Sequence, residues 1–432
     1  MVKKIAGLFF FFWCLLLLPF GAVLAAGSGA YRLELPDSEA MGMGSAFVAQ
    51  ADNPSAIYYN PAGLTQLEGN QMSLGVGVVQ PFRTYTDSSG NEIEGRRDRF
   101  VIPHFYFVSD LGLEDFAFGL GGSSYWGLGT YWAEDSFSRY VSTKADLIEK
   151  DIKLVGAYQV NDNLSIGLSL DYTNSYVNKK KKLVQAGGPD GDFQLKGRDD
   201  DGWGYRVSLL YKPNERHRFG LMYRSAIKLK YKGKLYLNGL NAFGLNYQAI
   251  FGGTSYETEI TSESTLPQSI ALGYCYKPND KWLFEFDVEW MDWASTEQER
   301  IVYEDETSPL RLSVLNNGNP APRDWEDVFS FALGGEYKLN DKWSLRGGYF
   351  YHNSPIPEEN FDTSLPDSDS HSVTVGVGHR LNDHTKIDLA YAAMFFEERD
   401  INNNVGSSSG ATIDGEYETF TNIYMVTVNY KF

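Results

Sequence analysis

The sequence predicts an all-β protein, a fourteen-stranded antiparallel transmembrane β-barrel with a small helical hatch, or plug, in its lumen. Apolar and polar residues alternate with a period of two in fourteen segments between Gln71 and the C-terminus. The connections between these segments switch regularly between short turns and long loops. Such a regular switch is typical of a single-chain outer-membrane barrel.

The chain begins with a predicted secretory signal peptide over residues 1–25. Two lysines precede a long uncharged run, and the small residues at Val23–Ala25 offer a cleavage site before Ala26. Pro19 interrupts the run, which favours a cleaved signal over the alternative of an uncleaved anchor helix. The mature chain then keeps one cysteine, Cys275, so an internal disulfide or a cysteine-rich metal site is excluded.

The composition excludes several function classes. A formal net charge of −18 at pH 7 argues against a nucleic-acid partner, because no cationic field is available for phosphates. The nucleophile-elbow, zinc-protease and phosphate-loop motifs are all absent. We therefore expect no enzyme, no cofactor and no metal. An outer-membrane lipase or protease stays open as an alternative, since such sites need not leave a local motif.

The segment after the signal, residues 26–70, is predicted to form the hatch. It contains ADNPSAIYYNPAGL at residues 51–64, and each Asn-Pro pair suggests a helix N-cap followed by proline at the first helical position. An even strand number with short periplasmic turns puts both chain ends in the periplasm. A compact, mostly apolar segment there suits a plug, whereas the alternative, a periplasmic tail, would be polar and of low complexity.

Residues 71–432 are predicted to form the barrel wall. Residues 284–290, FEFDVEW, alternate four apolar residues with three acidic ones. Strands are predicted near residues 71–84, 99–109, 115–124, 148–159, 164–177, 203–212, 218–232, 266–277, 282–293, 328–338, 343–352, 371–380, 385–396 and 418–432. A soluble β-sandwich or propeller would also alternate, but it has no reason to separate short from long connections so regularly.

The turns and strand ends support the same prediction. Several short connections share an Asn-Asp core, as in YKPNDKW at residues 276–282 and YKLNDKW at 337–343, and these residues favour tight turns. Aromatic residues stand at many strand ends, where an outer-membrane barrel has its girdles. The chain ends on Phe432 in register with the apolar face, and this terminus is similar to the sorting signal of outer-membrane barrels.

The N-terminal residues also carry a resemblance to a known family. Gly42 and Gly44 in MGMGSA, followed by Asn60, Pro61 and Ala62 in YNPAGLT, resemble the hatch of the long-chain fatty acid and aromatic-hydrocarbon transporters of the outer membrane. The resemblance implies a monomeric barrel, plugged by its N-terminal residues, that passively takes up hydrophobic small molecules. The rival function is a structural or adhesive barrel whose long loops bind partners.

The same resemblance implies a kink in the third strand that opens the wall beside the hatch. The sequence FGLGGSSYWG places Gly119, Gly121 and Gly122 in that strand. Clustered glycines suit a bulge or a bend within a strand. We therefore expect the kink at these three residues.

Inward-facing cations are the candidate ligand-binding residues. The period of two turns Arg206, Arg224, Lys228, Lys230 and Arg346 toward the lumen. The same rule places carboxylates opposite them, at Asp171, Glu285, Asp287, Glu289 and Asp388. Two interpretations stay open: a structural network of paired charges, or one or two cations that hold the carboxylate of an acyl ligand.

Two charged stretches on the outer side complete the candidates. Lys179–Lys182 ends the fifth strand where lipopolysaccharide phosphates would lie, although a solvated charge run explains it equally well. The acidic stretch Asp190–Gly202 has oxygen ligands for Ca²⁺ but lacks EF-hand spacing, so we expect a solvated loop.

Overall fold

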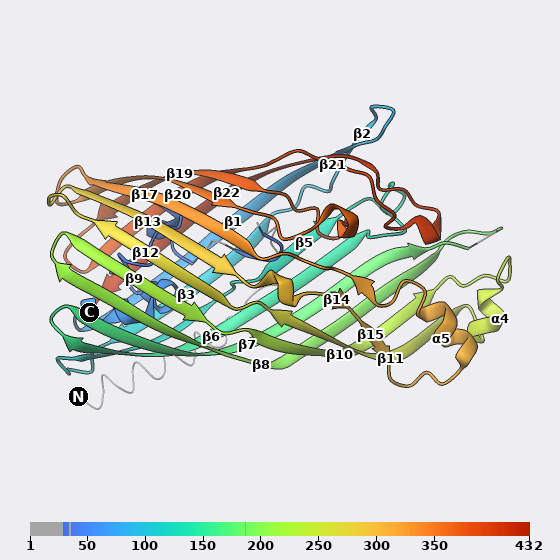
Figure 1. The fold of residues 1–432 in the computed structure, drawn as a ribbon, viewed down its shortest axis with the longest axis horizontal. Helices are drawn as coiled ribbons and strands as arrows, with labels where there is room; N and C mark the ends of the chain where they lie inside the picture. Colours follow the sequence, from blue (N-terminus) through green and yellow to red (C-terminus); the bar gives the residue numbers. More distant parts are fainter. Residues whose placement is uncertain (1–28, 34–35, 186) are drawn as a thin grey trace.

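The computed structural model describes residues 29–33, 36–185 and 187–432, which form a closed antiparallel barrel with a 14-stranded wall (Figure 1). The predicted signal peptide and its cleavage site lie outside the described residues. The barrel closes because β1 (Asn70–Thr86) pairs with β22 (Gly415–Lys431) from Gln71 opposite Lys431 to Thr86 opposite Glu416. The fourteen-stranded fold predicted from the alternation is confirmed.

The other twelve wall strands follow in chain order, and three of them are interrupted. They are β3 (Phe100–Ser109), β4 (Phe116–Ser123) with β5 (Gly127–Tyr131), β6 (Lys144–Asn161), β7 (Leu164–Leu183), β8 (Gly191–Asn214), β9 (His217–Arg224) with β10 (Ile227–Asn238), β11 (Ser255–Leu266) with β12 (Ser269–Tyr276), β13 (Trp282–Met291), β17 (Val328–Lys338), β18 (Trp343–His352), β19 (Ser370–Arg380) and β20 (Thr385–Phe396). Short outer strands are β2 (Glu92–Glu94), β14 (Gln298–Glu299), β15 (Ile301–Tyr303), β16 (Ala321–Pro322) and β21 (Arg399–Ile401).

The two faces of the wall differ as the period of two requires. On β13, Phe284 and Phe286 are exposed on the outer surface, whereas Glu285 and Asp287 are buried on the lumenal side. The thiol of Cys275 is free and buried on β12. No helix in the described part of the chain is both long enough and apolar enough to cross a bilayer.

The two ends of the barrel are unequal. The short turns and the C-terminus lie at one end, while β2, α4 (Tyr247–Phe251) and α5 (Pro309–Leu315) lie at the other (Figure 1). At that outer end an apolar cluster joins β8, β10 and β11 to the two helices, including Leu195, Leu235 and Phe251. The outer strands therefore continue as a folded structure beyond the part of the wall that faces lipid.

Two connections predicted as loops are strand instead. The acidic stretch Asp190–Gly202, expected to be a solvated loop, lies in β8 from Gly191 onward. The expected loop 233–265 is mostly β10 and β11, with only residues 239–254 connecting them. The outer face of these strands is polar, as exposed Asp192, Lys196 and Arg198 of β8 show. The sequence there lacks the apolar face by which the membrane-spanning strands are recognised.

The seventh wall strand changes face between β9 and β10. Ser225 and Ala226 interrupt it, and the Ser225 hydroxyl accepts a 2.9 Å hydrogen bond from the Tyr205 N–H. After the interruption Leu229 points inward and the lysines point outward, so Lys228 and Lys230 are exposed. Their predicted lumenal orientation is therefore wrong, because the alternation changes face where β9 ends and β10 begins, although the register with both neighbouring strands is the same on either side.

The described residues 29–33 and 36–69, called the N-terminal segment below, lie within the barrel (Figure 1). Helix α2 (Ser38–Gly42) packs against β18, β19, β20 and β22. Helix α3 (Ala56–Tyr59) and the 3-10 helix η1 (Pro61–Gln66) follow, and η1 packs against β6, β7 and β8. Short helices close their own backbone hydrogen bonds, which suits a segment that has no sheet partner along most of its length.

Candidate functional site

The wall of the barrel is interrupted beside the N-terminal segment. The ladder between β3 and β4 ends at Phe105 opposite Gly122, and β5 is paired as a strand with β6. Among the described residues, Phe100–His104 of β3 therefore have a strand partner on the β1 side alone. Every residue of β5 is buried, so both of its faces are covered and it lies inside the line of the wall.

The interruption lies at Ser124–Trp126 and not at the glycines expected to form the kink. Gly119, Gly121 and Gly122 are paired with strands on both sides. A Cβ added at Gly119 would come within 2.8 Å of the Ile57 side chain, and one at Gly121 within 2.9 Å. The missing side chains therefore make room for the N-terminal segment, which corrects the predicted role of these glycines in the bend.

The bent residues are held from two sides. The Tyr125 and Trp126 N–H groups donate to the Glu149 carboxylate on β6, at 3.0 and 3.1 Å. On the other side the Leu33 N–H donates to the Tyr125 carbonyl at 2.8 Å. The bend thus links the wall to the N-terminal segment.

Asn60 makes three hydrogen bonds, two within the N-terminal segment and one to the wall. Its side-chain oxygen accepts from the Ala62 N–H at 3.1 Å and caps η1, with Pro61 at the first helical position as predicted. Its amide donates to the Val48 carbonyl at 2.7 Å and to the Leu209 carbonyl of β8 at 3.0 Å. The side chain is fully buried.

Close backbone approach explains the small residues of the two segment motifs. Gly44 has φ +65°, and a Cβ there would come within 2.6 Å of the Tyr349 backbone. The Thr374 hydroxyl accepts from the Gly44 N–H at 2.9 Å and donates to the Gly42 carbonyl at 3.2 Å. On the opposite wall Gly167 leaves room for the Pro61-Ala62 peptide in the same way.

Two wall carboxylates bind the backbone of the segment instead of lumenal cations. Asp287 accepts from the N–H groups of Phe47 and Val48 at 2.7 and 3.0 Å. Glu285 accepts from the next two N–H groups at 2.6 and 2.8 Å. The sequence placed both carboxylates in the lumen, but the alternation contains no signal for their backbone partners.

Arg206 and Arg346 are committed to ion pairs. Arg206 pairs with Asp171 at 2.7 Å and donates to the Tyr58 carbonyl at 2.8 Å. Arg346 contacts three carboxylates at 2.7–2.8 Å, those of Glu39, Glu336 and Asp388. Because each buried guanidinium already has a carboxylate partner, both residues fit the structural interpretation of the lumenal charges.

Arg224 is different. It is 4% exposed, its guanidinium lies 3.4 Å from the centre of the Tyr125 ring, and it lines a lumenal cavity of about 40 Å³. In the described part of the chain its Nε and Nη1 have no hydrogen-bond partner. A buried cation with unused donors is costly unless a ligand or water satisfies them.

A larger cavity of about 170 Å³ lies toward the outer end of the barrel. Apolar side chains such as Leu147, Val177 and Ile260 line it, together with Tyr31 of the N-terminal segment. Charged residues also line it: Glu299 pairs with Lys179 and, at 2.8 Å, with Arg323. Burial alone would raise the pKa of Glu299, but these two cations hold it well below its ordinary value.

Aromatic rings connect the two cavities. Tyr31 contacts Trp293 with ring centres 5.8 Å apart, and Trp293 contacts Trp126 at 5.4 Å. Trp126 then contacts Tyr125 at 4.5 Å, and Tyr125 contacts Tyr58 at 5.4 Å. The N-terminal segment, the wall interruption and an outer loop therefore meet in one aromatic cluster.

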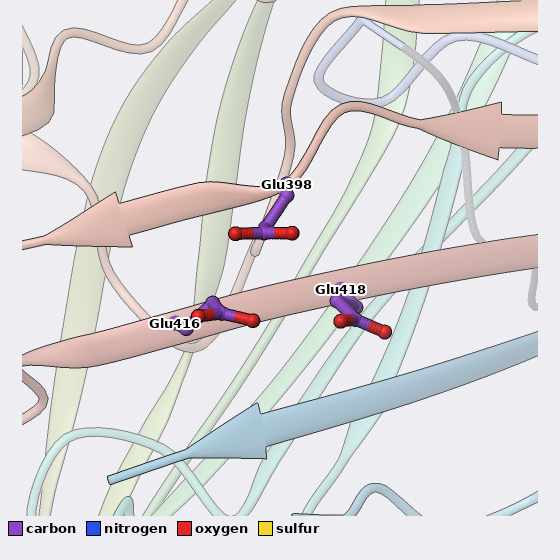
Figure 2. A group of neighbouring side chains, drawn as sticks. All are labelled: Glu398, Glu416 and Glu418. Atoms are coloured by element: carbon purple, nitrogen blue, oxygen red, sulfur yellow. The ribbon is translucent and has the colours of Figure 1, made fainter. Parts of the chain in front are cut away.

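Two further groups of charged residues lie away from the lumen. Lys182 pairs with Glu134 and Asp192 at 2.8 and 2.7 Å, and Lys180 is exposed. Figure 2 shows Glu398, Glu416 and Glu418, whose carboxylate oxygens lie within 4.8 Å of one another. Two of the three are exposed, and exposed acidic groups are common without an ion, so we assign no metal to them.

Comparison with known proteins extends over nearly the whole chain. The model of the outer membrane protein transport protein family (OMPP1/FadL/TodX) matches residues 21–432. The long-chain fatty acid transport protein of Escherichia coli (strain K12) is 22% identical over 420 residues, covering 88% of this chain and 91% of that protein. Outer membrane protein P1 of Haemophilus influenzae is 23% identical over 465 residues, covering 94% and 96%.

Solved structures share the fold. A Pseudomonas aeruginosa FadL homologue superposes with a TM-score of 0.76 at 18% identity, covering 93% of this chain and 99% of its own. The Pseudomonas putida toluene transporter TodX superposes with a TM-score of 0.69 at 20% identity, covering 94% and 99%. Because the family model spans almost the entire sequence, this chain belongs to the OMPP1/FadL/TodX family of outer-membrane transport proteins.

Proposed function

We propose that this outer-membrane barrel takes up hydrophobic small molecules, long-chain fatty acids or hydrocarbons, by passive diffusion. The observation that carries the proposal is the wall interruption at Ser124–Trp126, which faces the lumen beside the N-terminal segment. A barrel that served as a scaffold or an adhesin would need no interruption in its wall. The related proteins named for fatty acid and toluene transport support the same substrate classes.

Residues 26–70 act as the hatch of this barrel, and residues 1–25 are removed as a signal peptide. The hatch is held mainly through its own backbone, by Asp287, Glu285 and Thr374 of the wall. Such contacts close the lumen to polar solutes while leaving the wall ladder independent of the segment. The mature protein should therefore begin near Ala26, which its intact mass would reveal.

The ligand follows the two cavities inward. It enters the apolar outer cavity, passes Tyr31 and reaches the cavity that Arg224 lines. There the unused donors of Arg224 hold a carboxylate when the ligand is a fatty acid. The wall interruption next to Tyr125 then gives the apolar ligand a lateral way into the membrane, so that it avoids the polar periplasmic mouth.

The barrel works as a monomer, since its wall closes within one chain and needs no second copy to complete it. It carries out no chemical reaction and uses no cofactor or metal. Lys180, exposed at the outer end of β7, contacts lipopolysaccharide phosphate. None of these features requires a partner protein.

Equilibrium binding to the purified barrel tests this function. Isothermal titration in detergent with a long-chain fatty acid, a long-chain alkane and toluene should give saturable binding of at least one of them. A polar solute of similar size should give none. The proposal fails if an assembled barrel, shown by its faster gel migration before boiling, binds none of the three.

A further inference from the structure

At the interruption of the wall, the sheet offers no acceptor to the backbone N–H groups of Tyr125 and Trp126. The buried side chain of Glu149 accepts a hydrogen bond from each of them. We propose that Glu149 is the positioning residue that holds the third wall strand in its bent, open form. The inference rests on the proposed lateral route and assigns a residue to it. Glu149 was not among the candidates from the sequence, because alternation on β6 places it in the lumen without revealing what it faces.

The strand register locates Glu149 opposite the interruption. The ladder between β4 and β6 stops at Ser123 opposite Asp151, and the ladder between β5 and β6 resumes at Gly127 opposite Ile148. Three residues of the bent strand thus face two residues of β6. One extra residue on one strand defines a β-bulge, which bends the strand that carries it.

The contacts show how the bulge is stabilised. One carboxylate oxygen of Glu149 accepts from the N–H groups of both Tyr125 and Trp126, at 3.0 and 3.1 Å, and the side chain is 1% exposed. Buried N–H groups without an acceptor are costly. The carboxylate therefore favours the bent strand over any form in which these donors point elsewhere.

A second side chain of β6 holds the near side of the bend. The Lys153 ammonium donates to the Ser123 hydroxyl at 3.0 Å and pairs with Asp151. Lys153 is fully buried and supplies positive charge close to Glu149. Lys153 and Glu149 thus fix residues on either side of Ser124, where the bend begins.

Straightening the strand would close the wall. Phe100–His104 of β3 have no strand partner on this side among the described residues, so a straight third strand would find its ladder there. Glu149 competes with that pairing by binding the donors of Tyr125 and Trp126. It also fixes Tyr125, whose ring lies 3.4 Å from the Arg224 guanidinium, so the bend and the lumenal cation are placed together.

Two variants and one control test the proposal. Glu149→Leu removes the acceptor, whereas Glu149→Gln keeps a neutral carbonyl acceptor of nearly the same size. Asp388→Asn is the control, since Asp388 is also a buried lumenal carboxylate but pairs with Arg346 of β18 and has no bond to the bent backbone. Two readouts are measured in barrels that pass the unboiled gel assay: amide hydrogen exchange over residues 120–130 and cellular uptake of a labelled fatty acid and of toluene.

We expect Glu149→Leu to speed exchange at Tyr125 and Trp126 by at least roughly tenfold, as leaving two buried N–H groups without an acceptor implies. Uptake should fall severalfold, Glu149→Gln should recover part of both, and Asp388→Asn should stay near the parent protein. Unchanged exchange in an assembled Glu149→Leu barrel would overturn the proposal. So would faster exchange with normal uptake, because the bend would then be irrelevant to transport.

Failure of the proposed function would look different. If the parent barrel transports nothing, uptake cannot distinguish the variants from the parent. Hydrogen exchange at the Tyr125 and Trp126 amides still decides whether Glu149 holds the bend. If Glu149→Leu does not assemble, the smaller Glu149→Ala removes the same acceptor and is measured in its place. Exchange at parent rates in Glu149→Ala together with parent uptake would then overturn the proposal.

Discussion

The Asp287 carboxylate of β13 accepts a 2.7 Å hydrogen bond from the Phe47 backbone N–H in the N-terminal segment. A second bond, from Val48 at 3.0 Å, joins the same oxygen. The wall therefore holds the segment by its backbone, while the wall strands make their own ladder. The segment can therefore loosen without unfolding the wall.

Replacing Asp287 by alanine should loosen the segment without unfolding the barrel. Two buried N–H groups lose their acceptor, so the free energy of local opening near Phe47 should fall by about 1–3 kcal/mol. Hydrogen exchange over residues 44–52 measures this change. Asp146→Asn is the control, since Asp146 accepts hydrogen bonds from wall side chains, those of Tyr131 and Asn178. Equal loosening in both variants would contradict the assignment.

Asn60→Ala should destabilise η1 locally by roughly 0.5–2 kcal/mol, the usual range for losing a helix cap. The barrel should still migrate faster unboiled, and protease should reach the segment more easily. Asn60→Ser is the matched comparison, because a serine hydroxyl can still accept from the Ala62 N–H while the amide donors are lost. An alanine variant as protected as the parent protein would rule out the capping role.

Arg224→Ala should weaken binding of a long-chain carboxylic acid by about 1–3 kcal/mol, the range for a charged hydrogen bond. Binding of an alkane of equal length should hardly change. Lys228→Ala provides the control, because Lys228 is exposed on the outside of β10 and should leave both affinities unaltered. Titration calorimetry measures all four affinities. Equal losses for acid and alkane in the Arg224 variant would indicate general damage to the barrel.

Deleting residues 27–68 should leave a folded barrel that either leaks small polar solutes or no longer transports its apolar ligand. The reason is that the ladder from β1 to β22 closes without the segment. Liposome swelling with a small sugar measures the leak, and the parent barrel sets the baseline. A deletion variant that leaks nothing and transports normally would mean that the segment is only a tail.

Strands that face lipid were the most predictable part of the molecule. On β7, for example, Leu168 and Leu170 are exposed, while Ser169 and Asp171 are buried, as the alternation requires. Because the outer face contacts lipid, every second residue of these strands is apolar. The sequence alone therefore shows which residues face outward. The Asn60 cap could also be predicted, since Asn before Pro is a local signal. The same signal at Asn53 was wrong, because α3 begins at Ala56 with Ser55 at its N-cap position.

Features that depend on long-range contacts were not predictable. The interruption at Ser225 and Ala226 reversed the faces of Lys228 and Lys230, and no composition signal marks it. The outer half of β8 has polar residues on its outer face, so its acidic stretch resembles a loop. Glu149 and Asp287 look like ordinary lumenal acids in the sequence, because their partners are backbone groups from distant parts of the chain.

Uptake by living cells tests the central claim most directly. A Gram-negative host that lacks its own transporter of this family would express the chain, and entry of a labelled long-chain fatty acid and of toluene would be timed. We predict that uptake of at least one compound rises severalfold over the empty vector, and that the deletion of residues 27–68 changes that rate. Uptake equal to the empty vector for every hydrophobic compound, with the barrel assembled in the outer membrane, would contradict the account.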